Sequence, residues 1–248
     1  MMKSKTQTIL FVFLLVILGG ILFKCPYKLP YLGFYEIKIY PHRINSLERL
    51  ENALKYFNGL ELDLVYHSTN NYLDVNHPPA KSIDLSLETY LGHISNQQKP
   101  FLWLDIKNLD VNNADKIFNK LQELTIKYDY SKSLILIETQ SPEALKIFTA
   151  AGYKTSYYLP ANLNLLKGEA LNTKLQKIAN ILEAQPEIGI STSYKDYEII
   201  VKHFPTKKKY IWALTSSYSL DILKIRQILK DDLVEIVLTK FRTSSGNR

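Results

Sequence analysis

The feature that most constrains the fold is a regular alternation, from about residue 33 onward, of short apolar runs with longer segments of helical period. This alternation is typical of repeated β-α units, which build parallel sheets. The expected strands are 35–40, 60–66, 101–106, 134–138, 155–159, 188–191, 210–215 and 234–239. The expected helices are 46–57, 85–94, 113–128, 144–150, 173–183, 195–203 and 220–230. Eight strands with helices between them predict an α/β fold, a (β/α)₈ TIM barrel over residues 31–248.

The segment before the barrel is strongly apolar. Residues 9–23 read ILFVFLLVILGGILF, an unbroken apolar run with Lys3 and Lys5 before it and Lys24 after it. This length suits the apolar region of a secretory signal or a short membrane span. No small-residue cleavage site follows the run, and Lys24 stands directly before Cys25, where a lipoprotein signal would need a small residue.

These features predict an N-terminal hydrophobic helix that stays attached to the chain. We expect residues 1–30 to be an uncleaved signal anchor and linker, with a transmembrane helix over about residues 8–23. Such an anchor would make the chain a single-pass membrane protein. We expect its N-terminus to be cytoplasmic and its barrel domain to lie outside the cytoplasm.

The net charge of +7 does not point to nucleic acid. Residues 1–30 hold four lysines and no acidic residue, which leaves a net charge of +3 on the other 218 residues. That remainder has no arginine-rich stripe, so we expect no nucleic-acid partner. The single cysteine, Cys25, excludes an intrachain disulfide and a cysteine-built zinc or iron–sulfur site.

Two of the expected strands carry charged residues on one face. In the run LELDL at 60–64, the period of two puts Glu61 and Asp63 on one face and three leucines on the other. In the run LDIK of the next expected strand, Asp105 and Lys107 share a face in the same way. We expect the leucines to pack under the outer helices, and the charged faces to point into the barrel interior or its mouth.

A charge without a partner is expensive to bury, so these groups need one another or a ligand. Three carboxylates beside one lysine could bind a hard divalent cation such as Mg²⁺ or Ca²⁺, which prefers oxygen ligands. A buried salt-bridge cluster around Lys107 fits the same pattern, and the pattern alone leaves both interpretations open.

Two histidines are expected near strand ends, where a barrel presents catalytic groups. His42 ends the first expected strand, and His77 follows the second in the run NHPP. Together they could act as general base and general acid, although single histidines are more often structural. Trp212 is by default a residue of the core or the barrel filling. The sequence has no G-x-S-x-G, G-x-G-x-x-G, Walker-type or H-E-x-x-H motif, so serine-hydrolase, dinucleotide and zinc-protease functions have no support.

The ordered set of His42, Glu61-x-Asp63, His77 and an acid-x-Lys in a third strand resembles the glycerophosphodiester phosphodiesterase superfamily, which includes the venom sphingomyelinase D enzymes. Within that superfamily the chain looks most like the menorin-type branch. The runs that carry this second resemblance are HRINS (42–46), HPPA (77–80), LSLE (85–88) and LDIK (104–107).

The superfamily resemblance implies a TIM barrel that hydrolyses a phosphodiester of glycerol or of a phospholipid headgroup. It implies one divalent cation, Mg²⁺ or Ca²⁺, bound by Glu61, Asp63 and Asp105. It implies catalytic roles for His42, His77 and Lys107. It also implies that Arg43, Asn45 and Trp212 bind the substrate. From the apolar run we expect the membrane to be a partner through the N-terminal helix.

The sequence departs from this family pattern at two places. The phosphodiesterases usually read His-Arg-Gly, whereas Ile44 follows Arg43 here. Asp105 stands where the phosphodiesterases commonly carry Glu. In this respect the sequence resembles the sphingomyelinase D branch, which has Asp there. The first hypothesis is therefore a membrane-anchored, metal-dependent phosphodiesterase. The alternative is a catalytically inactive, menorin-like exported domain that binds a protein or glycan partner.

Overall fold

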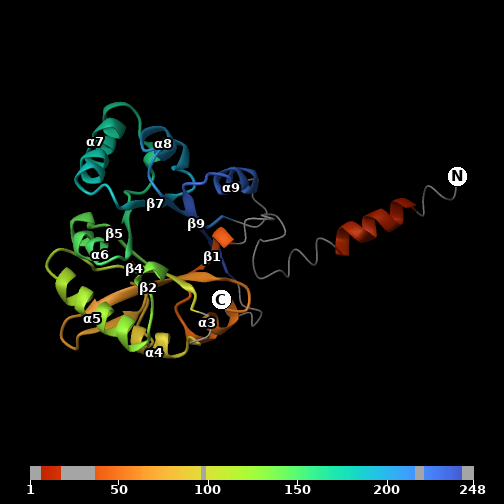
Figure 1. Cartoon of the computed structure of the whole chain (residues 1–248). Helices are drawn as coiled ribbons and strands as arrows, with labels where there is room; N and C mark the ends of the chain where they lie inside the picture. Colours follow the sequence, from red (N-terminus) through yellow and green to blue (C-terminus); the bar gives the residue numbers. More distant parts are fainter. Residues whose placement is uncertain (1–6, 18–36, 96–98, 216–220, 242–248) are drawn as a thin grey trace.

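A curled nine-stranded sheet forms the centre of the computed structural model, which describes residues 7–17, 37–95, 99–215 and 221–241. Its strand order is β1-β9-β8-β7-β6-β5-β4-β2-β3, so the first strand lies beside the last (Figure 1). The strands are β1 (Ile39–His42), β2 (Gly59–His67), β3 (Tyr72–Val75), β4 (Phe101–Ile106), β5 (Ile135–Thr139), β6 (Lys154–Tyr158), β7 (Gly189–Ser193), β8 (Lys209–Ala213) and β9 (Val234–Lys240). All neighbouring pairs are parallel except β2 and β3.

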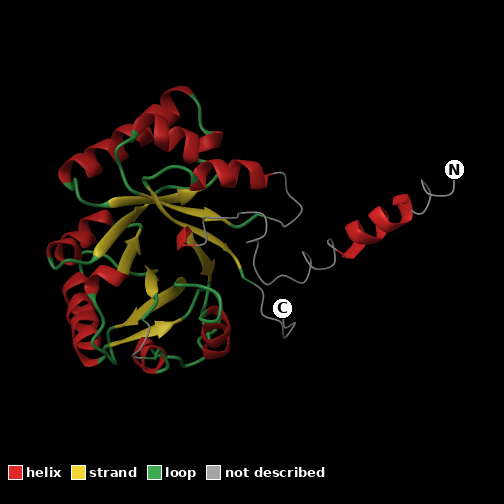
Figure 2. Ribbon diagram, turned by 45° about the vertical axis from the view of Figure 1, so that its right-hand side comes forward, coloured by secondary structure: helices red, strands yellow, loops and turns green. Residues whose placement is uncertain are grey.

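Helices follow the parallel strands along the chain and lie outside the sheet (Figure 2). They are α3 (Leu47–Ala53), α4 (Leu87–Gly92), α5 (Ala114–Lys127), α6 (Lys146–Ala150), α7 (Gly168–Ala184), α8 (Tyr197–His203) and α9 (Asp221–Leu229). Every expected helix and every expected strand has a counterpart, which confirms a mixed α/β arrangement like that of a TIM barrel. Residues 31–36 and 242–248 lie outside the described residues, so the domain bounds 31–248 stay a prediction.

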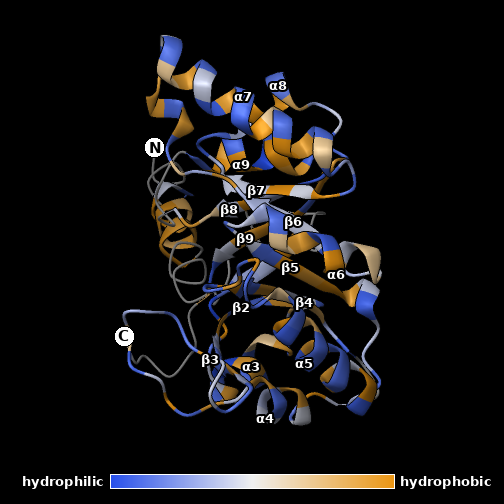
Figure 3. Cartoon of the chain, turned by 90° about the vertical axis from the view of Figure 1, so that its left-hand side faces the viewer, coloured by the Kyte–Doolittle hydropathy of each residue, from blue (hydrophilic) through white to orange (hydrophobic). Residues whose placement is uncertain are grey.

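The side-chain faces expected for the charged strands are confirmed. The outward leucines of β2 are fully buried and belong to the core between the sheet and the helices. A second, smaller cluster fills the barrel interior below the charged residues, and its members are Tyr40, Phe101, Trp103, Leu136, Tyr210, Ile236 and Leu238. In Figure 3 hydrophilic and hydrophobic residues alternate along α5 and α7, as expected for helices that cover a sheet with one face.

The two ends of the parallel sheet meet where β1 runs into α3. The Ile44 N–H donates to the Glu61 carbonyl oxygen of β2 (2.8 Å), and the Asp63 N–H donates to Asn45 Oδ1 (3.0 Å). Arg49, near the start of α3, donates to the carbonyl oxygens of His42 (3.3 Å) and Arg43 (2.9 Å). The same guanidinium also donates to the carbonyl oxygen of Phe241 (3.2 Å), just after β9. One arginine therefore links the end of β9 to the β1–α3 corner.

The hairpin strand β3 was not expected from the sequence. β2 continues to His67, one residue beyond its expected end, and turns through Asn71, whose φ is 49°. β3 then pairs antiparallel with the outer half of β2, from Leu64 to His67. The hairpin matters for the site because it delivers the chain to His77, immediately after β3.

The N-terminal segment is described only in part. Residues 7–17 are helical, and their large apolar side chains are exposed. Among the described residues, no helix has both the length and the apolar character that a membrane crossing requires. Residues 18–36, which include Cys25 and the rest of the expected span, lie outside the described part. The signal anchor and the linker therefore stay predictions.

We expect Arg49→Met to destabilise the barrel. The substitution keeps much of the apolar length but removes the donors to three carbonyl oxygens, a loss of about 2 kcal/mol for hydrogen bonds from a charged group. In a domain of this size that corresponds to a fall in Tm of roughly 4–8 °C. The matched control is Arg226→Met on the exposed side of α9, which should leave Tm within about 1 °C. Equal Tm values for the two variants would show that Arg49 does not hold the corner.

Candidate active site

Acidic side chains from three neighbouring strands meet inside the barrel. In the sheet register Asp63 of β2 lies opposite Asp105 of β4, and Asp105 lies opposite Glu138 of β5. Glu61 is two residues earlier on β2 and faces the same way. Because the strands are parallel, these carboxyl groups gather at one end of the barrel, where the carboxyl ends of strands place functional groups.

Three of these carboxylates could hold a cation together. Glu61, Asp63 and Asp105 are buried, and one oxygen of each lies within 4.8 Å of the others. Lys107 Nζ lies 2.6 Å from Asp63 Oδ1 and also forms an ion pair with Asp105. Both interpretations of the sequence pattern are thus visible in one cluster, a lysine salt bridge and an all-oxygen donor set. Three carboxylates against one ammonium leave a negative balance, and this donor set fits a hard divalent cation.

The proton affinities of the cluster reflect this crowding. Burial raises the pKa of Glu61, and the charges of Asp63 and Asp105 raise it further. Burial also raises the pKa of Asp105, although Lys107 opposes the shift. Burial by itself lowers the pKa of Lys107, but the carboxylates of Asp105 and Asp63 outweigh it and raise that pKa above its usual value. Lys107 is therefore a permanent cation of the cluster.

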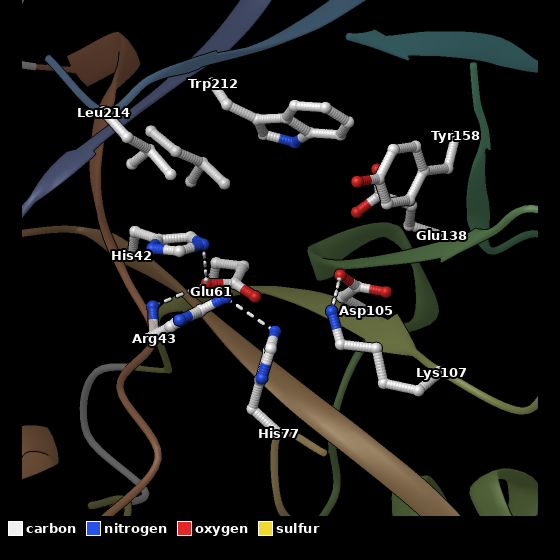
Figure 4. Close-up of a pocket in the computed structure, with 11 residues that line it drawn as sticks. His42, Arg43, Glu61, His77, Asp105, Lys107, Glu138, Tyr158, Trp212 and Leu214 are labelled. Atoms are coloured by element: carbon white, nitrogen blue, oxygen red, sulfur yellow. Dashed lines mark hydrogen bonds and ion pairs between the residues drawn. The ribbon is translucent and has the colours of Figure 1, made fainter. Parts of the chain in front are cut away.

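The two histidines lie on the same side of the pocket (Figure 4). His42 Nε2 is 3.7 Å from Glu61 Oε2, and burial lowers the pKa of His42 to about 3, although the charge of Asp63 opposes the shift. The imidazole is thus neutral at pH 7. His77 Nε2 lies 2.6 Å from an Arg43 guanidinium nitrogen. Because arginine only donates, His77 Nε2 accepts this bond and its proton is on Nδ1.

Arg43 and Asn45 shape the loop after β1. Arg43 has a φ of 56°, and its N–H donates to Glu61 Oε2 (2.6 Å). The Arg43 side chain is half exposed, with Nε 3.8 Å from Asp63 Oδ2. Asn45 Nδ2 donates to Asp63 Oδ2 (2.6 Å), while its Oδ1 accepts from the Asp63 N–H. Both ends of the Asn45 amide are therefore engaged with Asp63, whereas the Arg43 guanidinium faces the pocket.

The pocket between these groups has a cavity volume of about 130 Å³. Glu138, Tyr158 and Trp212 form its far wall (Figure 4), and Leu214 and Leu238 also line the pocket. Trp212 therefore lines the pocket and also packs against the cluster that fills the barrel interior. A liquid water occupies about 30 Å³, so the cavity has the volume of about four waters.

Sequence reasoning missed Glu138 and Tyr158. Glu138 belongs to a strand that was expected. The period of two that identified Glu61 as an interior residue also puts Leu136 and Glu138 on the interior face. Burial raises the pKa of Glu138 well above its usual value, the charge of Asp105 adds to this shift, and the nearby Ser191 and Trp103 side chains oppose it. Tyr158 ends β6 and carried no signal beyond its position at a strand end.

Comparison with known proteins finds structures of the same fold but no relative by sequence. No protein-family profile and no curated protein matches the sequence. A glycerophosphodiester phosphodiesterase from Parabacteroides distasonis is similar in structure, with a TM-score of 0.57, 19% identity, and coverage of 84% of this chain and 94% of that one. The corresponding values for the Thermotoga maritima glycerophosphodiester phosphodiesterase are 0.55, 15%, 82% and 94%.

A third structure of the same fold is an Oleispira antarctica phosphodiesterase in complex with its product, sn-glycerol-3-phosphate. Its TM-score is 0.57 at 12% identity, with coverage of 85% of this chain and 94% of that one. The similarity confirms that this chain folds like the glycerophosphodiester phosphodiesterases, the fold implied by its motifs.

We expect a divalent cation to stabilise the protein through the three carboxylates. At a concentration 100 times its Kd, Mg²⁺ or Ca²⁺ adds about 2.7 kcal/mol, which raises Tm by roughly 5–10 °C. Glu61→Gln and Asp105→Asn should abolish this rise in a thermal denaturation series. Glu235→Gln, near the opposite end of the barrel strands, should retain it. An equal rise in all three variants would place the cation elsewhere.

Asn45→Ala separates two roles for this residue. Because its amide is engaged with Asp63, we expect the variant to weaken metal binding by about 10–100-fold, the usual effect of removing a group that orients a ligand. The metal dependence of Tm measures this change. A variant with wild-type metal affinity but a raised KM would instead assign Asn45 to substrate binding.

Proposed function

We propose that this protein is a membrane-anchored, metal-dependent phosphodiesterase that hydrolyses a glycerophosphodiester or the headgroup phosphodiester of a phospholipid. We further propose that it belongs to the menorin-type branch of the superfamily, on the four sequence runs that resemble that branch. The N-terminal apolar segment supports the anchor, with the barrel domain outside the cytoplasm.

One observation carries the proposal. Three buried carboxylates, a lysine and two imidazoles, distant in sequence, converge on one pocket at the carboxyl ends of the strands. A structural ion-pair cluster would need the lysine and the acids but not a cavity lined by His42 and His77. The three comparison structures that share this fold are phosphodiesterases by name.

The residues divide the chemistry of phosphodiester cleavage among them. A divalent cation held by Glu61, Asp63 and Asp105 would supply Lewis-acid stabilisation of charge on the phosphoryl oxygens. Lys107 donates to a non-bridging oxygen as negative charge grows there. The neutral His42 accepts the proton of the attacking water or substrate hydroxyl as the new phosphorus–oxygen bond forms. His77 gives a proton to the alcohol oxygen as its bond to phosphorus breaks. For this step its ring takes up a second proton from solvent at Nε2 once the Arg43 guanidinium moves onto the phosphate, so the pair acts as base and acid.

The pocket favours this function over a purely binding domain. A non-catalytic domain would be favoured by a closed pocket in which Lys107 pairs with both Glu61 and Asp63. Lys107 instead pairs with Asp63 and Asp105, and the cavity retains room beside Arg43 and the imidazoles. Ile44, the departure from the family pattern, is fully buried in the core and does not project into the pocket.

The test is phosphorus NMR on a panel of glycerophosphodiesters and lysophospholipids, with and without a chelator. We expect new phosphomonoester or cyclic phosphodiester resonances that the chelator suppresses. His42→Ala should lower the rate by about 10²–10⁴-fold, the usual worth of a general base. His203→Ala, at the exposed end of α8, is the matched control and should keep the wild-type rate. A panel that stays unchanged, while the metal still raises Tm, would favour the binding-domain alternative.

A further inference from the structure

The two ends of the barrel differ in charge. The loops that lead into the parallel strands, together with the first two residues of each of these strands, form the amino end of the barrel, which we call the basic face. Among the described residues this face carries nine lysines against five acidic residues. All of the lysines except the buried Lys209 are at least partly exposed. They are Lys38, Lys55, Lys99, Lys132, Lys154, Lys207, Lys208, Lys209 and Lys230.

The opposite end, where the pocket opens, has the reverse balance. The pocket region buries four carboxyl groups, and its lining includes two full-time cations, Arg43 and Lys107. Acidic residues also occupy the first turns of the helices that begin at this end. They are Glu48, Asp115, Glu143, Glu169, Glu198 and Asp221. The barrel therefore has a positive amino end and a negative pocket end.

Helix ends account for part of this asymmetry but not for all of it. The helices run back against the strands, so their C-termini, which carry partial negative charge, lie at the basic face. Lys38 donates to carbonyl oxygens at the end of α9, and Lys207 donates to carbonyl oxygens at the end of α7. A carbonyl oxygen carries no full charge, so these bonds do not cancel the lysines. The exposed Lys55, Lys208 and Lys230 add further positive charge at the same face.

The apolar N-terminal segment is tethered to the basic face. The chain enters the barrel at Ile37, directly before β1, and hence at the amino end of the strands. The Ile37 side chain is 71% exposed, and Ile126, near the end of α5 and at the same face, is 72% exposed. A tether turns a weak contact into an intramolecular one at a high effective concentration. If the apolar segment sits in a bilayer, the basic face is the end of the barrel that the chain holds closest to the lipid.

Charge, and not apolar exposure, distinguishes the two ends. Ile83, Val111 and Leu165 are also exposed, and they lie in loops on the pocket side. Phospholipid bilayers that contain anionic lipids attract lysines near the surface, each by about 5-fold in the binding equilibrium. The same surface repels the acidic pocket end. An anionic bilayer is therefore complementary to the basic face alone.

We propose that the basic face is a membrane-docking surface that contacts anionic phospholipid headgroups, so that the pocket opens away from the bilayer. The orientation rests on the proposed function in one respect, because it takes the N-terminal segment to be the anchor. The contact between lysines and headgroups does not depend on the anchor, and it does not depend on phosphodiesterase activity.

The first experiment locates each end of the barrel relative to the lipid. The whole chain, with Cys25→Ser, carries one fluorophore at Thr206→Cys on the basic face or at Ala161→Cys in the exposed β6–α7 loop on the pocket side. The protein is reconstituted in vesicles of phosphatidylcholine, with or without 30% phosphatidylglycerol, that contain a lipid with a nitroxide on its headgroup. We expect quenching at position 206 to exceed quenching at position 161 by at least 3-fold, in the anionic vesicles only.

Two matched sets of substitutions test the lysines. Lys55→Gln, Lys208→Gln and Lys230→Gln together remove three exposed charges from the basic face. Lys81→Gln, Lys167→Gln and Lys195→Gln together remove three exposed charges from loops on the pocket side. The first set should lower the ratio of docked to undocked protein about 100-fold and abolish the quenching at position 206. The second set should leave that quenching unchanged.

Salt separates this contact from the anchor. In 1 M NaCl the Debye length falls from about 10 Å to about 3 Å, so the quenching at position 206 should disappear while the anchored protein still sediments with the vesicles. Protein that leaves the vesicles in salt, after quenching at position 206 in low salt, would support the basic face and overturn the anchor. Equal quenching at the two positions, stronger quenching at position 161, or quenching at position 206 that persists in neutral vesicles would overturn the docking surface.

Discussion

The burial of four carboxyl groups inside one barrel is the constraint on which the rest of the site depends. Strand alternation and parallel register place Asp63, Asp105 and Glu138 side by side, and their mutual repulsion cannot be relieved by water. Each group is therefore provided with a specific partner. Lys107 pairs with two of them, the Arg43 N–H and the Asn45 amide engage Glu61 and Asp63, and the Trp103 indole engages Glu138. The positive charges of these partners are fewer than the negative charges of the four carboxylates, so the cluster fits a cation. Burial and like charges also hold the pKa values of Glu61, Asp105 and Glu138 above their usual range.

At the corner between β1 and α3 the backbone bends so that it can donate hydrogen bonds to the buried carboxylates. A left-handed φ at a residue other than glycine costs about 1–2 kcal/mol, and Arg43 adopts one. A hydrogen bond to an ionised group contributes about 1.5–3 kcal/mol, so the bond from the Arg43 N–H to Glu61 is enough to offset the strain. The bend also turns Ile44 into the core and directs its N–H to the β2 carbonyl. Glycine is unnecessary at position 44, because the unusual dihedral falls one residue earlier.

Much of this arrangement could be predicted from the sequence, and the limits have physical causes. Short apolar runs predicted the eight parallel strands, and the period of two predicted which face of β2 and β4 carries the charged residues. The β2–β3 hairpin was missed because β3 is only four residues long, and its Leu73 and Val75 are too few to establish a period. Glu138 could have been found by applying to β5 the alternation already applied to β2.

The carboxylates with which Lys107 pairs could not be predicted. A long side chain at a strand end reaches several carboxylates, and only the packed geometry selects among them. The engagement of Asn45 with Asp63 depends on the left-handed turn at Arg43, for which the sequence carries no glycine signal.

The pocket is built in two halves that differ in chemistry, and their separation suggests how one fold can retain a reaction while its substrate varies. The half from β1, β2, β4 and the loop after β3 carries the three carboxylates, the lysine and the two imidazoles of the proposed reaction, and mutual contacts tie their positions together. The half from β5, β6 and β8 meets that cluster where Asp105 of β4 lies opposite Glu138 of β5. A substitution at Tyr158 or Trp212 therefore changes the shape and charge of the far wall without removing a partner from the carboxylate cluster. Under the proposed function, the first half carries out the reaction and the second half bounds the space that the substrate occupies.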